Sequence, residues 1–192
     1  MTTIDLTTYT IRDTTVYRAA IIPSDLIQPS SAATAMSRLR EKTTVKTMVK
    51  QIFGSDAQID HAADGSPLLT GIPNPPFISI SHSSRFAVIA VNPTSPVGVD
   101  IEHWRKSLEK VAPRFLTPQQ NNIYNSEHLL LCAWTIKEAL FKVAETKPER
   151  TFIDMPLPPS PQSSKVIIDG HSFSICLLEN NPDTCLTLAV RD

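Results

Sequence analysis

Apolar and polar positions alternate in short runs along much of this chain, and two longer stretches instead follow the helical period. Strict alternation predicts strands, because successive side chains of a strand point to opposite faces. Apolar residues at every third or fourth position predict helices. We expect helices at about 33–53 and 129–144, and strands at 16–22, 57–59, on both sides of 81–85, and at 97–102, 165–168, 173–178 and 185–190. Each half of the chain therefore offers one long helix with several strands.

The run V-G-V-D-I-E at 97–102 alternates from end to end. Its valines and isoleucine point to one face, and Gly98, Asp100 and Glu102 point to the other. The two carboxylates lie about 7 Å apart along such a strand, a spacing that can hold one hard cation, and the glycine leaves the backbone open to a close ligand. A solvated strand face is the alternative, because most charged residues are simply exposed.

The stretch at 129–144 is apolar almost all round, as expected of a helix largely buried in a core. Its few charges share one side with two bulky aromatic residues, so we expect this side to line a partly desolvated cleft. The alternative is a helix with one wet face, on which an i,i+4 pair contributes only about 0.2–0.5 kcal/mol. The residues of this stripe are Trp134, Lys137, Glu138, Phe141, Lys142 and Glu145.

The segment I-S-I-S-H-S-S-R at 78–85 predicts a strand, a polar turn and the start of a second strand. The first strand ends in Ser81, His82 and Ser83, whose hydroxyl and imidazole groups can bind phosphate oxygens. A nucleophilic Ser-His pair is disfavoured, because neighbouring strand residues face opposite sides and no G-x-S-x-G turn is present.

Taken together and in this order, I-S-I-S-H-S, V-G-V-D-I-E and W-T-I-K-E-A-L-F-K resemble the 4'-phosphopantetheinyl transferases of the surfactin type. The segment at 40–54 resembles the first helix of that family, and D-G-S-P-L-L at 64–69 resembles its G-K-P turn. The resemblance implies an α+β fold, the 4'-phosphopantetheinyl transferase fold, with two pseudo-twofold-related halves that each pack a long helix on a small antiparallel sheet. It implies an N-terminal half at 1–96 with coenzyme A phosphate contacts, and a C-terminal half at 97–192 with the metal site and carrier docking.

The resemblance further implies that Asp100, Glu102 and Glu138 bind Mg2+, which also holds the pyrophosphate of coenzyme A. Two carboxylates about 5 Å apart repel by roughly 3 kcal/mol at an effective dielectric of 20, so three converging carboxylates favour a cation. The implied reaction transfers the 4'-phosphopantetheine arm of coenzyme A to a serine of an apo acyl or peptidyl carrier protein and releases 3',5'-adenosine bisphosphate. Glu138 and Lys142 are the expected catalytic residues, and either Glu138 or a water that it orients accepts the serine proton. This is the activity of a holo-[acyl-carrier-protein] synthase type transferase.

Coenzyme A phosphates are expected to contact residues from both halves. Lys142, Ser81 and His82 match phosphate-contacting positions of the family. Lys46 falls where the family usually has an arginine facing the 3'-phosphate, and Arg40 is expected to assist it. Lysine suits this role because its ammonium is a compact point charge.

Three departures from the family pattern bear on this interpretation. Ser66 stands where the G-K-P turn usually offers a lysine, which removes one phosphate contact. T-P-Q-Q at 117–120 stands where an acidic residue is more common. The segment at 145–161 replaces the usual glycine-containing stretch near the place where the pantetheine arm and the carrier meet.

Composition limits the possible classes of protein. The formal net charge is -1 with no sustained basic run, so we expect no nucleic-acid partner. No apolar run is long enough to span a bilayer, and the start of the chain lacks a signal-peptide pattern, so we expect a cytoplasmic protein without membrane association. The 3 cysteines fit no metal or disulfide framework and predict buried free thiols. A duplicated fold is compatible with a monomer.

Positive charge follows the acidic strand at Arg105, Lys106, Lys110 and Arg114. Because carrier proteins present an acidic helix beside their serine, this segment is a candidate docking surface, with a scattered solvated face as the alternative. Two alternatives to an enzymatic function are compatible with the sequence. One is a non-catalytic homologue that binds coenzyme A or the carrier, and the other is an adaptor domain whose charges are surface features.

Overall fold

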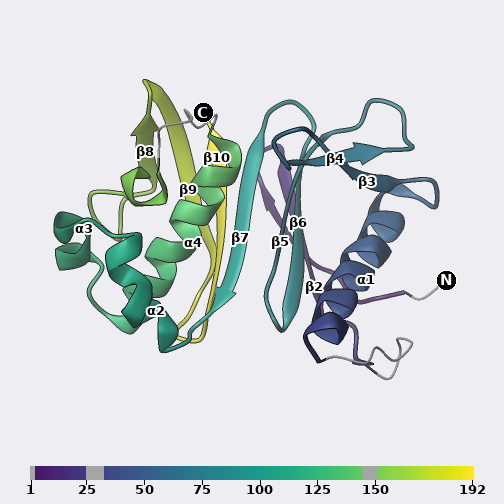
Figure 1. Ribbon diagram of the computed structural model, residues 1–192. Helices are drawn as coiled ribbons and strands as arrows, with labels where there is room; N and C mark the ends of the chain where they lie inside the picture. Colours follow the sequence, from purple (N-terminus) through teal and green to yellow (C-terminus); the bar gives the residue numbers. More distant parts are fainter. Residues whose placement is uncertain (1–2, 25–32, 145–150) are drawn as a thin grey trace. The chain divides into compact units, whose positions relative to one another are not determined.

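The computed structural model of the chain describes residues 3–24, 33–144 and 151–192, and its elements are drawn in Figure 1. The chain divides into two compact units, Met1–Thr94 and Ser95–Asp192. Each unit combines one long helix with a four-stranded antiparallel sheet. The predicted α+β class is therefore confirmed, whereas the pseudo-twofold relation between the halves stays a prediction.

The first unit is built on a sheet with the strand order β1-β2-β6-β5. A long helix, α1, packs on this sheet, and a hairpin of β3 and β4 follows the helix (Figure 1). The central strand β6 is F-A-V-I-A-V-N, and its residues 87–90 are fully buried. The elements are β1 (Thr7–Ile11), β2 (Thr14–Ala20), α1 (Ala33–Phe53), β3 (Gln58–His61), β4 (Pro67–Thr70), β5 (Phe77–His82) and β6 (Phe86–Asn92).

Helix α1 buries one apolar side and leaves its charges on the others. Val45, Met48 and Val49 belong to the core of the first unit, at the i, i+3 and i+4 spacing that places side chains on one helix face. The helix ends at Gly54, whose φ of 101° is left-handed and whose N–H donates to the carbonyl of Lys50 at 3.0 Å. Glycine ends helices in this way because it has no Cβ to oppose a positive φ.

The second unit is built on a sheet with the strand order β7-β10-β9-β8. Helix α4 packs on β7 and β10, and shorter helices connect β7 to α4 (Figure 1). Ser126 caps the start of α4 by accepting a hydrogen bond from the N–H of Leu129 at 3.3 Å. The elements are β7 (Val97–His103), α2 (Ser107–Val111), η2 (Ala112–Arg114), α3 (Pro118–Ile123), α4 (Glu127–Val143), η3 (Phe152–Asp154), β8 (Lys165–Ile168), β9 (His171–Asn180) and β10 (Thr184–Arg191).

The acidic side of β7 is the side that α4 covers. A Cβ built on Gly98 would lie 1.9 Å from the carbonyl oxygen of Ala139, so only glycine lets the helix approach this closely. The expectation that Gly98 leaves the backbone open to a ligand is therefore wrong, because Ala139 fills that space. Burial extends to both faces of the strand, and Asp100 is only 6% exposed.

The predicted helices and most predicted strands lie where the pattern placed them. Strands β1 and β4 and helices α2 and α3 were missed. Strand β1 is T-T-Y-T-I, with most of its side chains exposed, and α3 is P-Q-Q-N-N-I with no buried residue. These two elements carry little apolar periodicity of their own: β1 is held by pairing with β2, and α3 by the capping box at Thr117.

Candidate functional site

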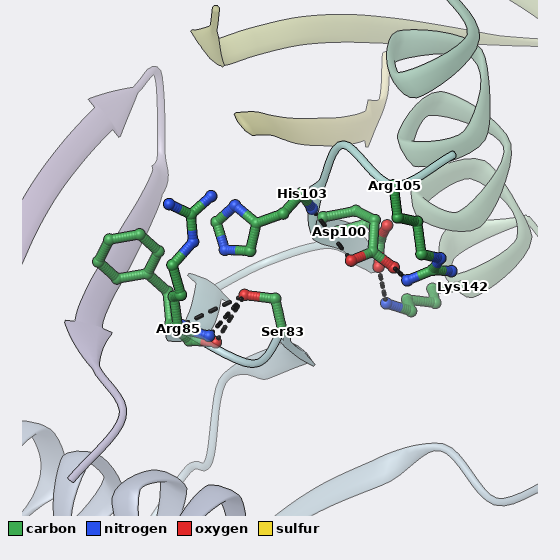
Figure 2. Close-up of polar contacts among 8 residues, drawn as sticks. Ser83, Arg85, Asp100, His103, Arg105 and Lys142 are labelled. Carbon is green, nitrogen blue, oxygen red and sulfur yellow. Dashed lines mark hydrogen bonds and ion pairs between the residues drawn. The ribbon is translucent and has the colours of Figure 1, made fainter. Parts of the chain in front are cut away.

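The predicted site of the second unit starts with an ion pair between its strand and its helix. Nζ of Lys142 on α4 lies 2.9 Å from Oδ1 of Asp100 on β7 (Figure 2). The same ammonium donates to the carbonyl of Val99 at 2.9 Å. Asp100 is buried, so the pairing compensates part of the cost of removing its charge from water. Two residues predicted to act together are thus in contact.

Glu138 lies one helical turn before Lys142 and within the field of the same group. Burial raises the pKa of Glu138, and the negative charges of Asp100 and Glu102 raise it further, while Lys142 lowers it. The three carboxylates of the predicted metal set are therefore close enough to influence one another. Repulsion of this kind favours either a proton or a cation at the site.

Glu102 has different partners from the other two acids. Its Oε2 lies 2.7 Å from Nη1 of Arg105, and its Oε1 accepts the N–H of His103 at 3.0 Å. Arg105, labelled in Figure 2, is therefore engaged by the acidic strand. His103 itself is buried, with its Nδ1 2.9 Å from the hydroxyl of Thr184, so its imidazole links β7 to β10.

The fit of a magnesium ion rests on the kind of donor present. Carboxylate oxygens are the hard ligands that Mg2+ takes together with water and substrate phosphates. Across residues 3–24, 33–144 and 151–192, the structure has no three acidic, histidine or cysteine side chains gathered closely enough to hold a metal ion by themselves. The donor chemistry of Asp100, Glu102 and Glu138 suits the ion, and their binding of it stays a prediction.

The charged stripe predicted on α4 divides between two sides of the helix. Lys137 is fully buried, and its Nζ donates to the carbonyls of Phe152 at 3.4 Å and Ile153 at 2.8 Å. Burial lowers the pKa of Lys137 to about 8. Lys137 therefore holds η3 through backbone carbonyls, and its full burial corrects the prediction that it lines a partly desolvated cleft. Glu145 lies outside the described residues.

The two aromatic residues of the stripe belong to an aromatic cluster on the side of η3. The Trp134 ring lies 5.1 Å from that of Phe115 and 5.4 Å from that of Phe152, both edge to face. The Phe141 ring lies 6.1 Å from that of Phe152. Trp134 also packs against the core of the second unit, whereas Phe141 is 43% exposed. Of the segment at 145–161, residues 145–150 lie outside the described part, and Thr151 and Asp154 form a capping box at η3.

The first unit holds a cavity of about 770 Å³ between α1 and the β3–β4 hairpin, lined also by β5. Two predicted coenzyme A contacts, Lys46 and His82, line it. Nδ1 of His82 lies 3.5 Å from Oε2 of Glu41, which also lines the cavity. Lys42, Lys50 and His61 line the same cavity and were not predicted. The i,i+4,i+8 spacing of the three lysines is the sequence signal that could have indicated them.

Arg40 and Ser81 lie apart from the lining of this cavity. The Nε of Arg40 donates to the carbonyl of Ile22 at 2.7 Å. Ser81 is buried and precedes His82 on β5, so their side chains leave the strand on opposite faces. The structure thus brings Lys46 and His82 together and places Arg40 and Ser81 elsewhere in the first unit.

The turn at Ser66, where the family resemblance expects a lysine, is closed by its own side chains. Both the N–H and the hydroxyl of Ser66 donate to Oδ1 of Asp64, at 2.9 and 2.7 Å. These bonds lower the pKa of the Asp64 carboxyl. Ser66 serves the turn, and no cation stands at this position.

The remaining predictions concern surface charge, thiols and membranes. Lys106, Lys110 and Arg114 are exposed on α2, η2 and the turn before them. All three cysteines are free, and Cys132 and Cys185 are buried with their sulfur atoms 3.8 Å apart. The prediction of burial is wrong for Cys176, which is half-buried on β9. Within the described residues, no helix combines the length and apolar character needed to cross a bilayer.

Comparison with known proteins places this arrangement in a family. Residues 96–187 match the 4'-phosphopantetheinyl transferase superfamily. The chain is 26% identical over 145 residues to 4'-phosphopantetheinyl transferase HetI of Nostoc sp. (strain PCC 7120 / SAG 25.82 / UTEX 2576), across 65% of this chain and 60% of that protein. It is 29% identical over 109 residues to the 4'-phosphopantetheinyl transferase of Bacillus subtilis, across 52% of this chain and 48% of that protein. The matches thus span only about half to three fifths of these relatives. The matched region contains Asp100, Glu102, Glu138 and Lys142, and through it residues 96–187 resemble the 4'-phosphopantetheinyl transferase superfamily.

Proposed function

We propose that this protein transfers the 4'-phosphopantetheine arm of coenzyme A to a serine of an apo carrier protein and releases 3',5'-adenosine bisphosphate, with Mg2+ as cofactor. The observation that carries the proposal is the pairing of Lys142 with Asp100 beside Glu138, inside the region that matches the superfamily. Carrier proteins and coenzyme A are the proposed partners. We assign the coenzyme A phosphate contacts to residues 1–96, and the metal site and carrier docking to residues 97–192.

The proposed reaction is a phosphoryl transfer. The serine oxygen forms a bond to the β-phosphorus of coenzyme A, and the bond from that phosphorus to the bridging oxygen breaks, so that its electron pair leaves with the bisphosphate. The serine proton passes to Glu138 or to a water that Glu138 orients. A carboxylate whose pKa is raised by burial and by neighbouring acids is a better proton acceptor than an exposed one.

Lys142 and the carboxylates have separate tasks in this proposal. Lys142 supplies a point charge to a phosphate, for which it exchanges its present contact with Asp100. Asp100, Glu102 and Glu138 are the residues that would hold Mg2+, which when bound neutralises charge on the diphosphate. The present pairing of Asp100 with Lys142 and of Glu102 with Arg105 satisfies the same carboxylates with cations of the chain itself.

A non-catalytic homologue that binds coenzyme A or a carrier is the second candidate. It is favoured by Ser66, which is bonded to Asp64 and leaves the β3–β4 turn without the lysine that the family pattern expects. Both candidate proteins bind coenzyme A or a carrier, but only the transferase modifies the carrier. A measurement of transfer activity therefore separates them.

The test is to incubate the protein with Mg2+, coenzyme A and an apo carrier protein, and then to weigh the carrier by mass spectrometry. A gain of one phosphopantetheine per carrier supports the transferase. Glu138→Gln is expected to reduce the rate by at least about 100-fold, because it removes a charge that acts on the reacting atoms. Glu127→Gln makes the same change at an exposed position of the same helix and is expected to leave the rate unchanged.

The other outcomes of the transfer assay distinguish the remaining candidate functions. Coenzyme A binding without any mass gain across several carriers favours the non-catalytic homologue. Absence of both binding and transfer favours an adaptor domain. Full activity of Glu138→Gln would contradict the assignment of Glu138 and leave the transferase itself in place.

A further inference from the structure

Two buried thiols of the second unit face each other between α4 and β10, and neither has a role in the proposed transfer. Cys132 of α4 and Cys185 of β10 are 3% and 0% exposed, and their sulfur atoms lie 3.8 Å apart. Helix α4 packs on β10, so this contact joins residues that are 53 apart in the chain (Figure 1). The sulfur atoms are in van der Waals contact, and closure to a disulfide bond of about 2.05 Å needs a shift of only about 2 Å.

The surroundings of the two sulfur atoms are polar, unlike those of an inert core cysteine. The hydroxyl of Thr135 lies 3.1 Å from Sγ of Cys185, and that of Thr187 lies 3.7 Å from it. Hydroxyl groups that donate to sulfur favour the thiolate, because they stabilise its negative charge. Sγ of Cys132 instead donates to Oδ1 of Asn180 at 3.2 Å, which favours the protonated thiol. The hydrogen bonds thus distinguish the two thiols.

A histidine adjoins the thiol of Cys132 at a distance of one helical turn. Nε2 of His128 lies 3.8 Å from Sγ of Cys132. Within the described residues, Nδ1 of this ring is buried and has no hydrogen-bond partner. A neutral imidazole can accept the thiol proton at Nε2, because this nitrogen faces the sulfur. His128 is the second residue of α4 and is half-buried, so solvent comes within one turn of the thiols.

We propose that Cys132 and Cys185 form a redox site, which a peroxide closes to a disulfide and a dithiol reductant opens again. In the first step the Cys185 thiolate attacks one peroxide oxygen, the O–O bond breaks, and the leaving hydroxide and the thiol proton form water. In the second step Cys132 gives its proton to Nε2 of His128, its sulfur bonds to that of Cys185, and the S–O bond breaks. The leaving hydroxide takes up that proton as a second water. Two thiols are oxidised, and one peroxide is reduced to two waters.

The disulfide would act beside the strand that carries the predicted metal ligands. In the antiparallel pairing of β10 with β7, Cys185 lies opposite Glu102, and Thr187 lies opposite Asp100. Opposite residues share a face of the sheet, and α4 packs on this face. Drawing α4 toward Cys185 therefore shifts the helix that carries Glu138 relative to the two carboxylates. We expect the oxidised protein to transfer phosphopantetheine about tenfold more slowly, and this expectation alone rests on the proposed function.

The experiment treats the chain carrying Cys176→Ser with hydrogen peroxide and follows its mass. This substitution removes the half-buried third cysteine, which leaves the buried pair as the remaining thiols. A loss of two hydrogen atoms, reversed by dithiothreitol, is expected, and peptide mapping is expected to join Cys132 to Cys185. The Tm of the oxidised protein is expected to rise by about 5 °C or more, because the bond links distant parts of the chain.

Further substitutions in the Cys176→Ser background separate the two steps. In Cys132→Ser the sulfenic acid of Cys185 has no partner thiol, and it is expected to react with dimedone. His128→Gln is expected to slow disulfide formation about tenfold, because an amide does not accept the proton. Circular dichroism verifies that each variant is folded. Addition of oxygen to single thiols without a cross-link, or a cross-link that forms as fast in urea as in the folded protein, would overturn the proposal.

The mass measurement and the transfer assay fail independently. A reversible disulfide in a protein that modifies no carrier would support the redox site and refute the transferase. Transfer by a protein that forms no disulfide with peroxide would refute the redox site and support the transferase. Equal transfer rates of the oxidised and reduced forms would refute the coupling of the disulfide to the acidic strand.

Discussion

At the scale of single residues, the stabilising role of Lys142 can be measured apart from its proposed role in binding phosphate. Its ammonium satisfies both the buried Asp100 carboxylate and the carbonyl of Val99. Removing that charge takes one cationic partner from a buried carboxylate, which is more costly than removing the carboxylate and keeping the lysine, because the lysine is partly exposed.

Lys142→Gln is therefore expected to lower the free energy of unfolding by about 1–3 kcal/mol, and Asp100→Asn by less. Urea unfolding followed by circular dichroism measures both values. If Asp100→Asn were the more damaging of the two, the buried carboxylate would have other partners that matter more than Lys142. Loss of transfer in a variant of unchanged stability would identify the chemical role.

Lys137 predicts an unusual dependence of stability on pH. Burial lowers its pKa to about 8, although the charge of Asp154 opposes the shift. Lysine in an unfolded chain titrates near 10.4, so between these values the unfolded state binds more protons than the folded state. The free energy of unfolding should therefore rise with pH from about 8 to about 10, and the full penalty of the buried charge should persist below pH 8.

The measurement compares the unmodified protein with Lys137→Met at pH 7, 8.5 and 10. The difference between their free energies of unfolding is expected to shift in favour of the unmodified protein as pH rises, by on the order of 1–3 kcal/mol. The series stops at pH 10 because burial raises the pKa of Tyr124 to about 12, so ionisation of the unfolded tyrosine reduces stability above that range. Parallel curves for the two proteins would show that the lysine is solvated.

At the scale of elements, the crossing of α4 over β7 depends on one glycine. Gly98→Ala would place a Cβ 1.9 Å from the carbonyl oxygen of Ala139 and force strand and helix apart. We expect a loss of about 3 kcal/mol or more in the free energy of unfolding, and a further loss of transfer because Asp100 and Lys142 separate. Thermal unfolding and the transfer assay test the two effects.

Gly65→Ala is the control substitution. An added Cβ meets nothing within 4 Å there, and only the positive φ of 86° disfavours alanine. Its expected cost is about 1 kcal/mol. Similar costs at both positions would mean that the crossing of α4 and β7 relaxes easily.

The elements that the pattern predicted are those that bury an apolar face. Helix α4 and the strands β5, β6 and β7 carry enough apolar residues for the period to be read from the chain alone. Strand β1 is defined by its register with β2, in which Thr7 opposes Arg18 and Ile11 opposes Thr14. The sequence of such a strand does not indicate a strand until its pairing partner is known.

At the scale of the whole molecule, association with a carrier is expected to depend on exposed positive charge. We infer that Lys106 and Lys110 contribute to docking, because both are exposed, whereas Arg105 is paired with Glu102 at 2.7 Å and its loss would disturb the acidic strand. Lys106→Glu with Lys110→Glu is expected to raise the KM for the carrier about tenfold, to flatten its salt dependence and to leave coenzyme A binding unchanged.

Steady-state kinetics at two salt concentrations measure this effect. Lys165→Glu serves as the control. This exposed lysine pairs with Asp192 and lies on β8, the edge strand of the second-unit sheet opposite to β7. Equal effects in the control would point to net charge as the cause and would contradict a defined docking surface.

The α+β class, the two long helices, the order of the three motifs and the family resemblance could all be read from the chain alone, because periodicity and motif spacing are local properties. Three features depend on the folded chain: the side of β7 that meets α4, the contact of Lys137 with the carbonyls of η3, and the place of Lys42, Lys46 and Lys50 around one cavity. The fold also places Arg40 on the carbonyl of Ile22 and closes the turn at Ser66 on Asp64. The rotation of a helix about its axis and the partner of a charged side chain depend on segments remote in the chain, and packing alone fixes them.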